Sequence, residues 1–118
     1  MSFPAPKPGY EAFDAFSMLL YYPDPPETAP VLDEAERKAL HAEHVAWVKG
    51  LRDAGVAILN GLFDPGGGII VLTVGPDEAR ELVAGDPFVI RGWLKVDVLT
   101  WRTPPGSMTP LVERAART

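Results

Sequence analysis

Four segments of the chain have the short, apolar, β-branched and aromatic composition of strands, and two have the periodicity of amphipathic helices. The expected strands cover residues 13–22, 56–63, 68–74 and 93–101, and the expected helices cover residues 34–54 and 76–84. Their order is β-α-β-β-α-β, the split βαβ pattern of ferredoxin-like proteins. Because βαβ crossovers are right-handed, both helices should lie on one face of a four-stranded antiparallel sheet. We therefore expect an α+β fold.

Turn-forming residues mark the ends of both expected helices. Asp33 followed by Glu36 predicts a capping box at the start of the first helix, and Gly55 ends it. Pro76 suits the first turn of the second helix, and Gly85 is expected to stop it with left-handed backbone geometry. A short final helix is expected around residues 111–117.

The first helix carries a histidine on its apolar side. The members of this stripe recur at helical spacing and are Leu40, His44, Trp47, Val48 and Leu51. The second helix is followed by Asp86, Pro87 and the large apolar Phe88. A carboxylate can hold an imidazole in one tautomer and support its charged form, so His44 and Asp86 are a candidate acid–base pair.

Both members of the pair have a structural alternative. A histidine on an apolar stripe can be a core residue, and Asp86 before Pro87 can cap a short turn through residues 89–90. Capping and orienting an imidazole are compatible, since a carboxylate has two oxygens. If the two side chains meet, we expect a separation of about 2.6–3.2 Å or one bridging water.

The expected strands are apolar on both sides, which is unusual for an antiparallel sheet with one face in water. In residues 68–74, for example, Val71 points to one side and Ile70 and Leu72 point to the other. Two helices can cover only one face, and the other would expose more than the few hundred Å² that a monomer usually tolerates. A second copy of the sheet is the simplest cover, so we expect a homodimer.

Charge and composition exclude several classes of protein. The 118 residues carry a formal net charge of −5, which argues against nucleic acids and anionic membrane surfaces as partners. The absence of cysteine excludes disulfides and thiol nucleophiles. Neither a signal peptide nor an apolar run of about 20 residues is present. We expect one domain over residues 1–118, with an arm (1–12), a core (13–102) and a tail (103–118), in the cytoplasm.

Other sequence features do not favour a metal or a nucleophilic serine. His41 and His44 could hold a metal with Glu43, but Glu43 points about 100° away around the helix. Residues 64–68 are better explained as a hairpin than as a phosphate loop, because they lack the lysine and the following helix. Ser17 lies inside a strand without a nucleophile-elbow pattern. We expect no metal and no cofactor.

Four pieces of the chain together resemble a known family. They are the run from His41 to Leu51 (HAEHVAWVKGL), residues 55–61 (GVAILNG), residues 77–79 (DEA) and residues 86–88 (DPF). In order and spacing they are similar to the YCII-related (YciI-like) family of the dimeric α/β-barrel, ferredoxin-like superfamily, over about residues 13–102. The resemblance implies that His44 and Asp86 face one pocket. Known members of the family include a dehydrochlorinase of a chlorinated aromatic compound, and the superfamily includes lactone isomerases and small monooxygenases.

Two positions depart from the pattern of this family. The position three before the histidine is often arginine, and here it is His41. A bidentate anion binder is thus replaced by a group that titrates near neutral pH, so an anionic substrate cannot be carried over from the family. The second strand often ends in Gly-Pro, and here it ends in Gly61 and Leu62.

These observations favour a cofactor-independent enzyme that acts on a small molecule by elimination or isomerisation. His44 would be the general acid or base and Asp86 its orienting partner. The further candidates for contact with substrate are His41, Trp47, Asn60 and Phe88. The alternatives are a dimeric protein that binds a small ligand without chemistry and a purely structural interaction domain.

Overall fold

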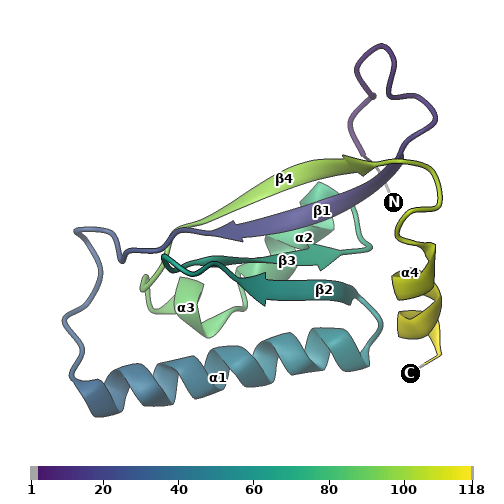
Figure 1. Cartoon of the computed structure of the whole chain (residues 1–118). Coiled ribbons are helices and arrows are strands. Elements are labelled where there is room, and N and C mark those ends of the chain that lie inside the picture. The colour runs from purple at the N-terminus through teal and green to yellow at the C-terminus, as the bar shows by residue number, and fades with distance from the viewer. Residues whose placement is uncertain (1–2, 118) are drawn as a thin grey trace.

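The computed structural model describes residues 3–117 and contains a four-stranded sheet and four helices (Figure 1). The strands are β1 (Asp14–Tyr21), β2 (Ala57–Leu62), β3 (Gly68–Leu72) and β4 (Val96–Thr103), and the helices are α1 (Glu34–Asp53), α2 (Pro76–Val83), α3 (Pro87–Ile90) and α4 (Thr109–Ala116).

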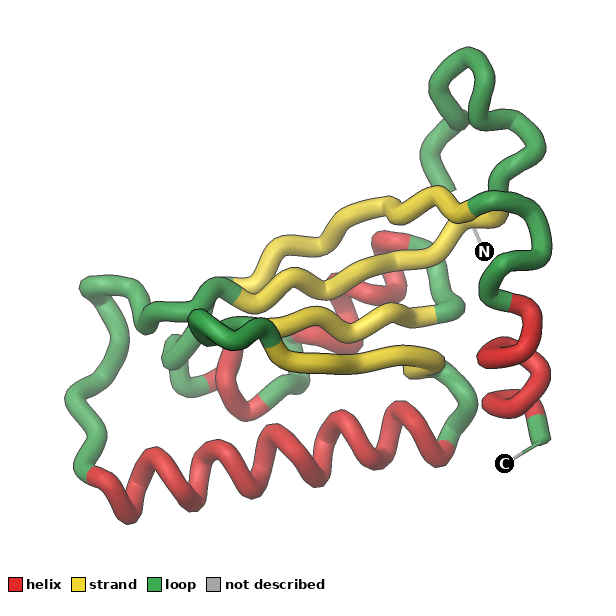
Figure 2. The backbone as a smooth tube through the Cα atoms, viewed as in Figure 1, coloured by secondary structure: helices red, strands yellow, loops and turns green. Residues whose placement is uncertain are grey.

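The strand order is β2-β3-β1-β4, and every neighbouring pair is antiparallel (Figure 2). β2 and β3 form a hairpin, whereas β1 and β2, and likewise β3 and β4, are joined through helices and are separated in the sheet by one strand, which is the ferredoxin-like arrangement. The register pairs Leu19 of β1 with Ile70 of β3 and with Val98 of β4. These three side chains point to the same face, because partners in register share a side of the sheet. The predicted α+β fold is confirmed.

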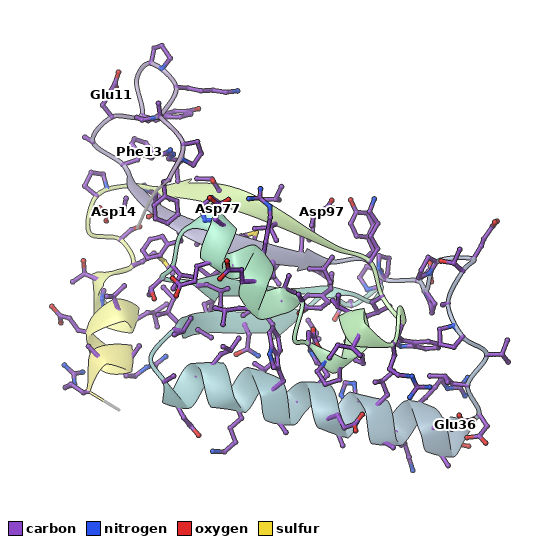
Figure 3. All side chains as sticks on the ribbon, turned by 180° about the vertical axis from the view of Figure 1, so that it is seen from behind. Glu11, Phe13, Asp14, Glu36, Asp77 and Asp97 are labelled. Carbon is purple, nitrogen blue, oxygen red and sulfur yellow. The ribbon has the colours of Figure 1, made fainter. Side chains whose placement is uncertain are left out.

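One face of the sheet carries α1, α2 and α3. Figure 3 looks onto this side, with Glu36 near the start of α1 and Asp77 near the start of α2. The shared core combines buried side chains of the three helices with those of β1 and β3: Leu40, Val48, Ala79, Val83, Phe88, Leu19, Tyr21, Ile70 and Leu72. Burial of this apolar surface is the main force that fixes α1 and α3 over the sheet.

The ends of α1 agree with the sequence-based prediction, and the end of α2 does not. The Asp33 carboxylate accepts from the backbone N–H of Glu36, whose own side chain accepts from the N–H of Asp33, so the predicted capping box is present. Gly55 has the expected positive φ of 76° after α1. Gly85 was expected to be left-handed, and this is wrong: α2 ends at Val83, its C-cap Ala84 has right-handed geometry, and Gly85 does not have a positive φ. The chain instead continues into the short helix α3, which Asp86 caps.

The start of the fourth strand also differs from the sequence-based boundaries. The strand begins at Val96, three residues after the expected start at Trp93. Gly92 has a φ of 65°, and the N–H of Trp93 donates to the carbonyl of Phe88 at 2.8 Å. This bond ties the segment after α3 back to the helix, so Trp93 and Leu94 lie in a loop. The other strands differ from expectation by one or two residues at their ends.

The second face of the sheet is partly covered by α4, which stands at one end of the sheet in Figure 1. Buried Phe16, Ile58 and Val71 on this face pack with partly buried side chains of the C-terminal segment, including Leu111 and Val112. The expectation that a second copy is the simplest cover of this face therefore overlooked the protein's own tail. Apolar surface remains uncovered there, since Leu99 is 44% exposed.

Two further observations concern the described residues. None of their helices combines the length and the apolar character that crossing a bilayer requires. The N-terminal arm touches the sheet, because a guanidinium nitrogen of Arg102 donates to the carbonyl of Pro4 at 2.5 Å.

Candidate functional site

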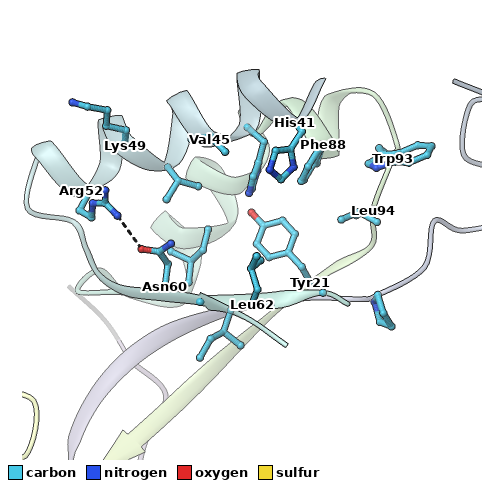
Figure 4. Close-up of a pocket in the computed structure, with 18 of the residues that line it drawn as sticks. Tyr21, His41, Val45, Lys49, Arg52, Asn60, Leu62, Phe88, Trp93 and Leu94 are labelled. Atoms are coloured by element: carbon cyan, nitrogen blue, oxygen red, sulfur yellow. Dashed lines mark hydrogen bonds between the residues drawn. The ribbon is translucent and has the colours of Figure 1, made fainter. Parts of the chain in front are cut away.

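A cavity of about 470 Å³ lies between α1 and the sheet. Its walls come from one face of α1, from β2 and β3, from the end of β1, and from α3 with the loop that follows it. Figure 4 shows Tyr21 rising from the sheet toward Phe88 and His41, with Asn60 farther along the same floor. This volume is within the range of small-molecule sites.

His44 and Asp86 meet at one end of this cavity. The Nδ1 atom of His44 lies 2.8 Å from Oδ1 of Asp86. The predicted contact is therefore present, although the catalytic roles remain a prediction. Asp86 is fully buried, whereas 15% of the His44 side chain is exposed and His44 belongs to the cavity wall. An ionised carboxylate can only accept hydrogen bonds, so Nδ1 carries the proton in this pair.

The position of Asp86 follows from its role as the cap of α3. Its Oδ1 accepts from the backbone N–H of Phe88 at 3.0 Å, as the alternative structural interpretation expected. The same oxygen receives His44, so capping and orientation occur together. Pro87 supplies the first helical residue with a fixed φ. The short helix α3 thus holds a carboxylate that the long helix α1 reaches from the other side.

Sequence reasoning missed the third partner of Asp86. The Tyr21 hydroxyl donates to Oδ2 of Asp86 at 2.5 Å, within the core. Burial raises the pKa of the Tyr21 phenol far above its usual value, and the hydrogen bond to Asp86 and the negative charge there raise it further. Tyr21 therefore stays protonated and donates throughout the physiological pH range. A buried tyrosine hydroxyl needs a partner, and this rule was the available signal.

Aromatic rings fix the plane of the His44 imidazole. The ring stacks on Phe88 with centroids 4.1 Å apart and an interplanar angle of 13°. Tyr21 approaches it edge-on, at 5.3 Å and 72°. With Nδ1 held by Asp86 and the ring held by these contacts, Nε2 is directed away from the carboxylate. No side chain among residues 3–117 is hydrogen-bonded to Nε2, which is left for a ligand.

The other candidate residues lie at different distances from this centre. His41, Asn60 and Phe88 line the cavity. Trp47 does not: it packs against the core, with its ring 6.0 Å from that of His44. The rings of His41 and His44 are 6.4 Å apart, and the described residues contain no group of three side chains that could bind a metal.

The mid-strand Ser17 is part of the sheet framework. Its hydroxyl is fully buried and donates to the carbonyl of Val74 at 2.7 Å. This bond satisfies the hydroxyl and joins β1 to the segment after β3. His44, in contrast, lines the cavity, and an imidazole held in this tautomer can accept a proton at Nε2.

Comparison with known proteins agrees with this architecture. The family model of the YCII-related domain matches residues 15–102. Among solved structures, the chain is similar to 5-chloro-2-hydroxyhydroquinone dehydrochlorinase from Burkholderia phenoliruptrix AC1100 in complex with 2,5-dihydroxybenzoquinone, with 21% identity and a TM-score of 0.55 over 75% of this chain and 95% of that chain. No curated protein sequence matches. The matched span includes β2 and β3, all but one end residue of β1 and of β4, and both His44 and Asp86, and the chain belongs to the family of YCII-related domains.

Proposed function

We propose that this protein is a small-molecule enzyme that uses His44 and Asp86 as a general acid–base pair for elimination or isomerisation. The observation that carries the proposal is the 2.8 Å contact between Nδ1 of His44 and the fully buried Asp86, on the wall of a cavity of about 470 Å³. A base whose tautomer and ring plane are fixed from behind is prepared to accept a proton from a bound molecule.

The proposed step is a proton transfer. Nε2 of His44 takes a proton from a C–H or O–H of the substrate, and the electron pair of the broken bond forms a new C=C or C=O bond. In an elimination, a leaving group departs from the neighbouring carbon with its own electron pair. In an isomerisation, the imidazolium returns the proton to a different carbon. Asp86 stabilises the imidazolium that forms between the two steps. This chemistry needs no electron acceptor and no cofactor.

The similarity to a dehydrochlorinase supports this class of reaction. The similar structure is named for its action on 5-chloro-2-hydroxyhydroquinone, and it holds a dihydroxybenzoquinone. Loss of HCl from a chlorinated ring is an elimination in which a base accepts the proton and chloride leaves with the electron pair. A flat ring would also suit the cavity end that Phe88, Tyr21 and His41 build from aromatic side chains.

The test is a panel of hydroxylated and chlorinated aromatic compounds, including 5-chloro-2-hydroxyhydroquinone. Release of chloride and incorporation of deuterium from D₂O into the compound are measured for the wild type and for His44→Asn. Deuterium incorporation reports proton abstraction even where no leaving group departs. We expect a loss of about 10²–10⁴ in the rate for His44→Asn, the usual contribution of a general base.

The matched control is Glu43→Gln, a polar substitution at the neighbouring exposed position of α1 that does not line the cavity. It should leave the rate unchanged. Full turnover by a folded His44→Asn variant would eliminate the proposed role, and the cavity would then belong to a protein that binds its ligand without chemistry.

We further propose that the protein is a homodimer formed through the uncovered part of the second sheet face. Its support is the exposure of Leu99 and Leu59, at 44% and 36%, next to half-buried Met18, Leu20 and Ile69. These side chains share the face that α4 leaves open. A two-fold interface would bury the same patch on both copies.

A further inference from the structure

The end of the cavity farthest from His44 is built differently from the catalytic end. Here Arg52 of α1 reaches toward the sheet, and its guanidinium donates to the side-chain oxygen of Asn60 on β2 at 3.4 Å (Figure 4). This contact joins the last turns of α1 to the edge strand. Between the two ends, the wall is apolar and includes Val45, Val48 and Ile70.

The cationic end belongs to the same helical face as the histidines. The residues of α1 that line the cavity are His41, His44, Val45, Val48, Lys49 and Arg52. Counted from His41, the other five lie three, four, seven, eight and eleven residues later, which places all of them along one side of the helix. With a rise of about 1.5 Å per residue, the Cα atoms of His44 and Arg52 are separated by about 12 Å along the axis.

The cavity wall is free of negative side chains, although the protein is acidic. The chain has 16 Asp and Glu against 11 Lys and Arg, yet no Asp or Glu of the described residues lines the cavity. Lys49 contributes to the wall, while its ammonium pairs with Asp53 at 2.6 Å outside it. Arg52 makes one hydrogen bond to neutral Asn60, and no carboxylate of residues 3–117 is paired with it. The remaining N–H groups of its fork can receive a ligand.

We propose that the Arg52 end is a carboxylate-binding subsite, and that the ligand is an elongated, flat hydroxy-carboxylic acid lying along α1. The inference rests on the proposed function only in assigning the hydroxyl end of the ligand as the end that reacts. The planar fork of Arg52 matches a carboxylate, Asn60 accepts one of its N–H groups, and the apolar middle of the cavity suits the carbon skeleton. The hydroxyl end then reaches His44 between Phe88 and Tyr21.

This subsite changes the expectation that followed from His41. The family position that often carries arginine has a histidine here. For that reason the family resemblance alone did not support an anionic substrate. Arg52 lies eleven residues later on the same face of α1 and supplies a permanent positive charge at the opposite end of the cavity. The ligand should therefore bind with its charged end away from His41.

Binding of 4-hydroxycinnamate tests the inference directly, with 4-hydroxycinnamamide as its neutral analogue and 4-hydroxybenzoate as a shorter acid. Isothermal titration calorimetry measures each dissociation constant. We expect the long acid to bind at least tenfold more tightly than the amide and more tightly than the short acid. Arg52→Gln should remove the preference for the acid over the amide, and Arg52→Lys should restore part of it. Arg114→Gln, the same loss of charge on α4, should leave all constants unchanged.

The outcome is independent of catalysis. His44→Asn should keep the preference for the acid, so a failed turnover assay leaves the subsite intact. Conversely, neutral compounds that are turned over by a base at His44 would preserve the proposed function without the subsite. Equal binding of acid and amide by the wild type, no binding of the acid at millimolar concentration, or an unchanged preference in Arg52→Gln would each overturn the inference.

Discussion

Tyr21 and Asp86 are 65 positions apart in the chain and joined by a hydrogen bond of 2.5 Å in the core. The bond links the end of β1 to the cap of α3, directly behind the His44 imidazole. Asp86 thereby accepts from a phenol, an imidazole and a backbone N–H while it is fully buried. Three donors compensate for the loss of water around a carboxylate that would otherwise be costly to bury.

Removal of the Tyr21 hydroxyl tests its role as a positioning residue. In Tyr21→Phe, Oδ2 of Asp86 stays buried without a donor, so the free energy of unfolding should fall by about 1–3 kcal/mol. Urea denaturation measures this change. In turnover assays we expect kcat to fall while KM changes little, because the ring that lines the cavity is retained.

The chain contains a matched control for this substitution. Tyr22 donates to Asp97 at 2.5 Å, but this pair lies outside the cavity wall and is less buried. Tyr22→Phe should therefore leave kcat at the wild-type value and cost less stability. An equal loss of kcat in both variants would assign Tyr21 a general structural effect and no specific effect on the pair.

The raised pKa of Tyr21 predicts a loss of stability in alkaline solution. In the folded state the phenol keeps its proton above pH 10, whereas in the unfolded chain it ionises near its ordinary pKa of about 10. The unfolded state thus binds fewer protons, and the free energy of unfolding falls as pH rises above about 10. Below that pH the full contribution is present.

This alkaline effect should disappear in Tyr21→Phe. The difference in unfolding free energy between the wild type and the variant, measured by urea denaturation, is expected to be constant between about pH 7 and 9 and to shrink above pH 10. Other tyrosines contribute equally to both proteins and cancel. A difference that stays constant up to pH 11 would contradict the buried, protonated phenol.

Asp86→Asn separates the capping role of Asp86 from its electrostatic role. The amide oxygen can still accept from the N–H of Phe88, so α3 should keep its cap. Because Oδ1 serves both Phe88 and His44, this amide oxygen also keeps the bond from Nδ1–H, and the NH₂ group faces Tyr21. The negative charge that stabilises the imidazolium is lost. We expect kcat to fall by about 10²–10⁴, while circular dichroism shows a folded protein. The ¹⁵N chemical shifts of the imidazole should show an unchanged tautomer, and full activity of the variant would argue against the electrostatic role of Asp86.

A neutral imidazole as the base also predicts a pH-dependent rate. Turnover of any substrate found should fall as the solution is acidified, because a protonated Nε2 has no lone pair to accept a proton. The measurement is kcat/KM between about pH 5 and 8. A flat profile over that interval would mean that His44 does not act as the base.

Much of the fold could be predicted because local signals agreed with one another. The capping box of Asp33 and Glu36 and the positive φ of Gly55 are decided within a few residues, so the sequence contains the whole cause. Gly85 misled because glycine permits left-handed geometry without requiring it. Whether the chain turns there depends on Asp86 and its partners, which are distant in sequence.

The site was predictable only in part for a related reason. His44 and Asp86 stand out as chemical groups at the end of apolar patterns, and the fold brings them together. Tyr21 was counted as one more apolar position of a strand, although its hydroxyl required a partner. Arg52 was missed because the buried side of α1 was defined from its mostly apolar stripe. The cavity is lined by a neighbouring face of the helix, which ends in charged residues. Only the position of β2 shows that this face encloses a space.

The proposed dimer predicts that a charge on the open sheet face separates the subunits. Leu99 is 44% exposed on this face, on the edge strand β4 and opposite Met18 in the register. A lysine in its place would bury one unpaired charge from each subunit in a two-fold interface. Leu99→Lys should therefore be monomeric. Val31→Lys introduces the same charge at a position that is 99% exposed in the loop before α1, and it should remain dimeric. Light scattering at micromolar concentration is expected to give about twice 12.8 kDa for the wild type and for Val31→Lys. A wild-type mass of 12.8 kDa would mean that α4 and water alone cover this face.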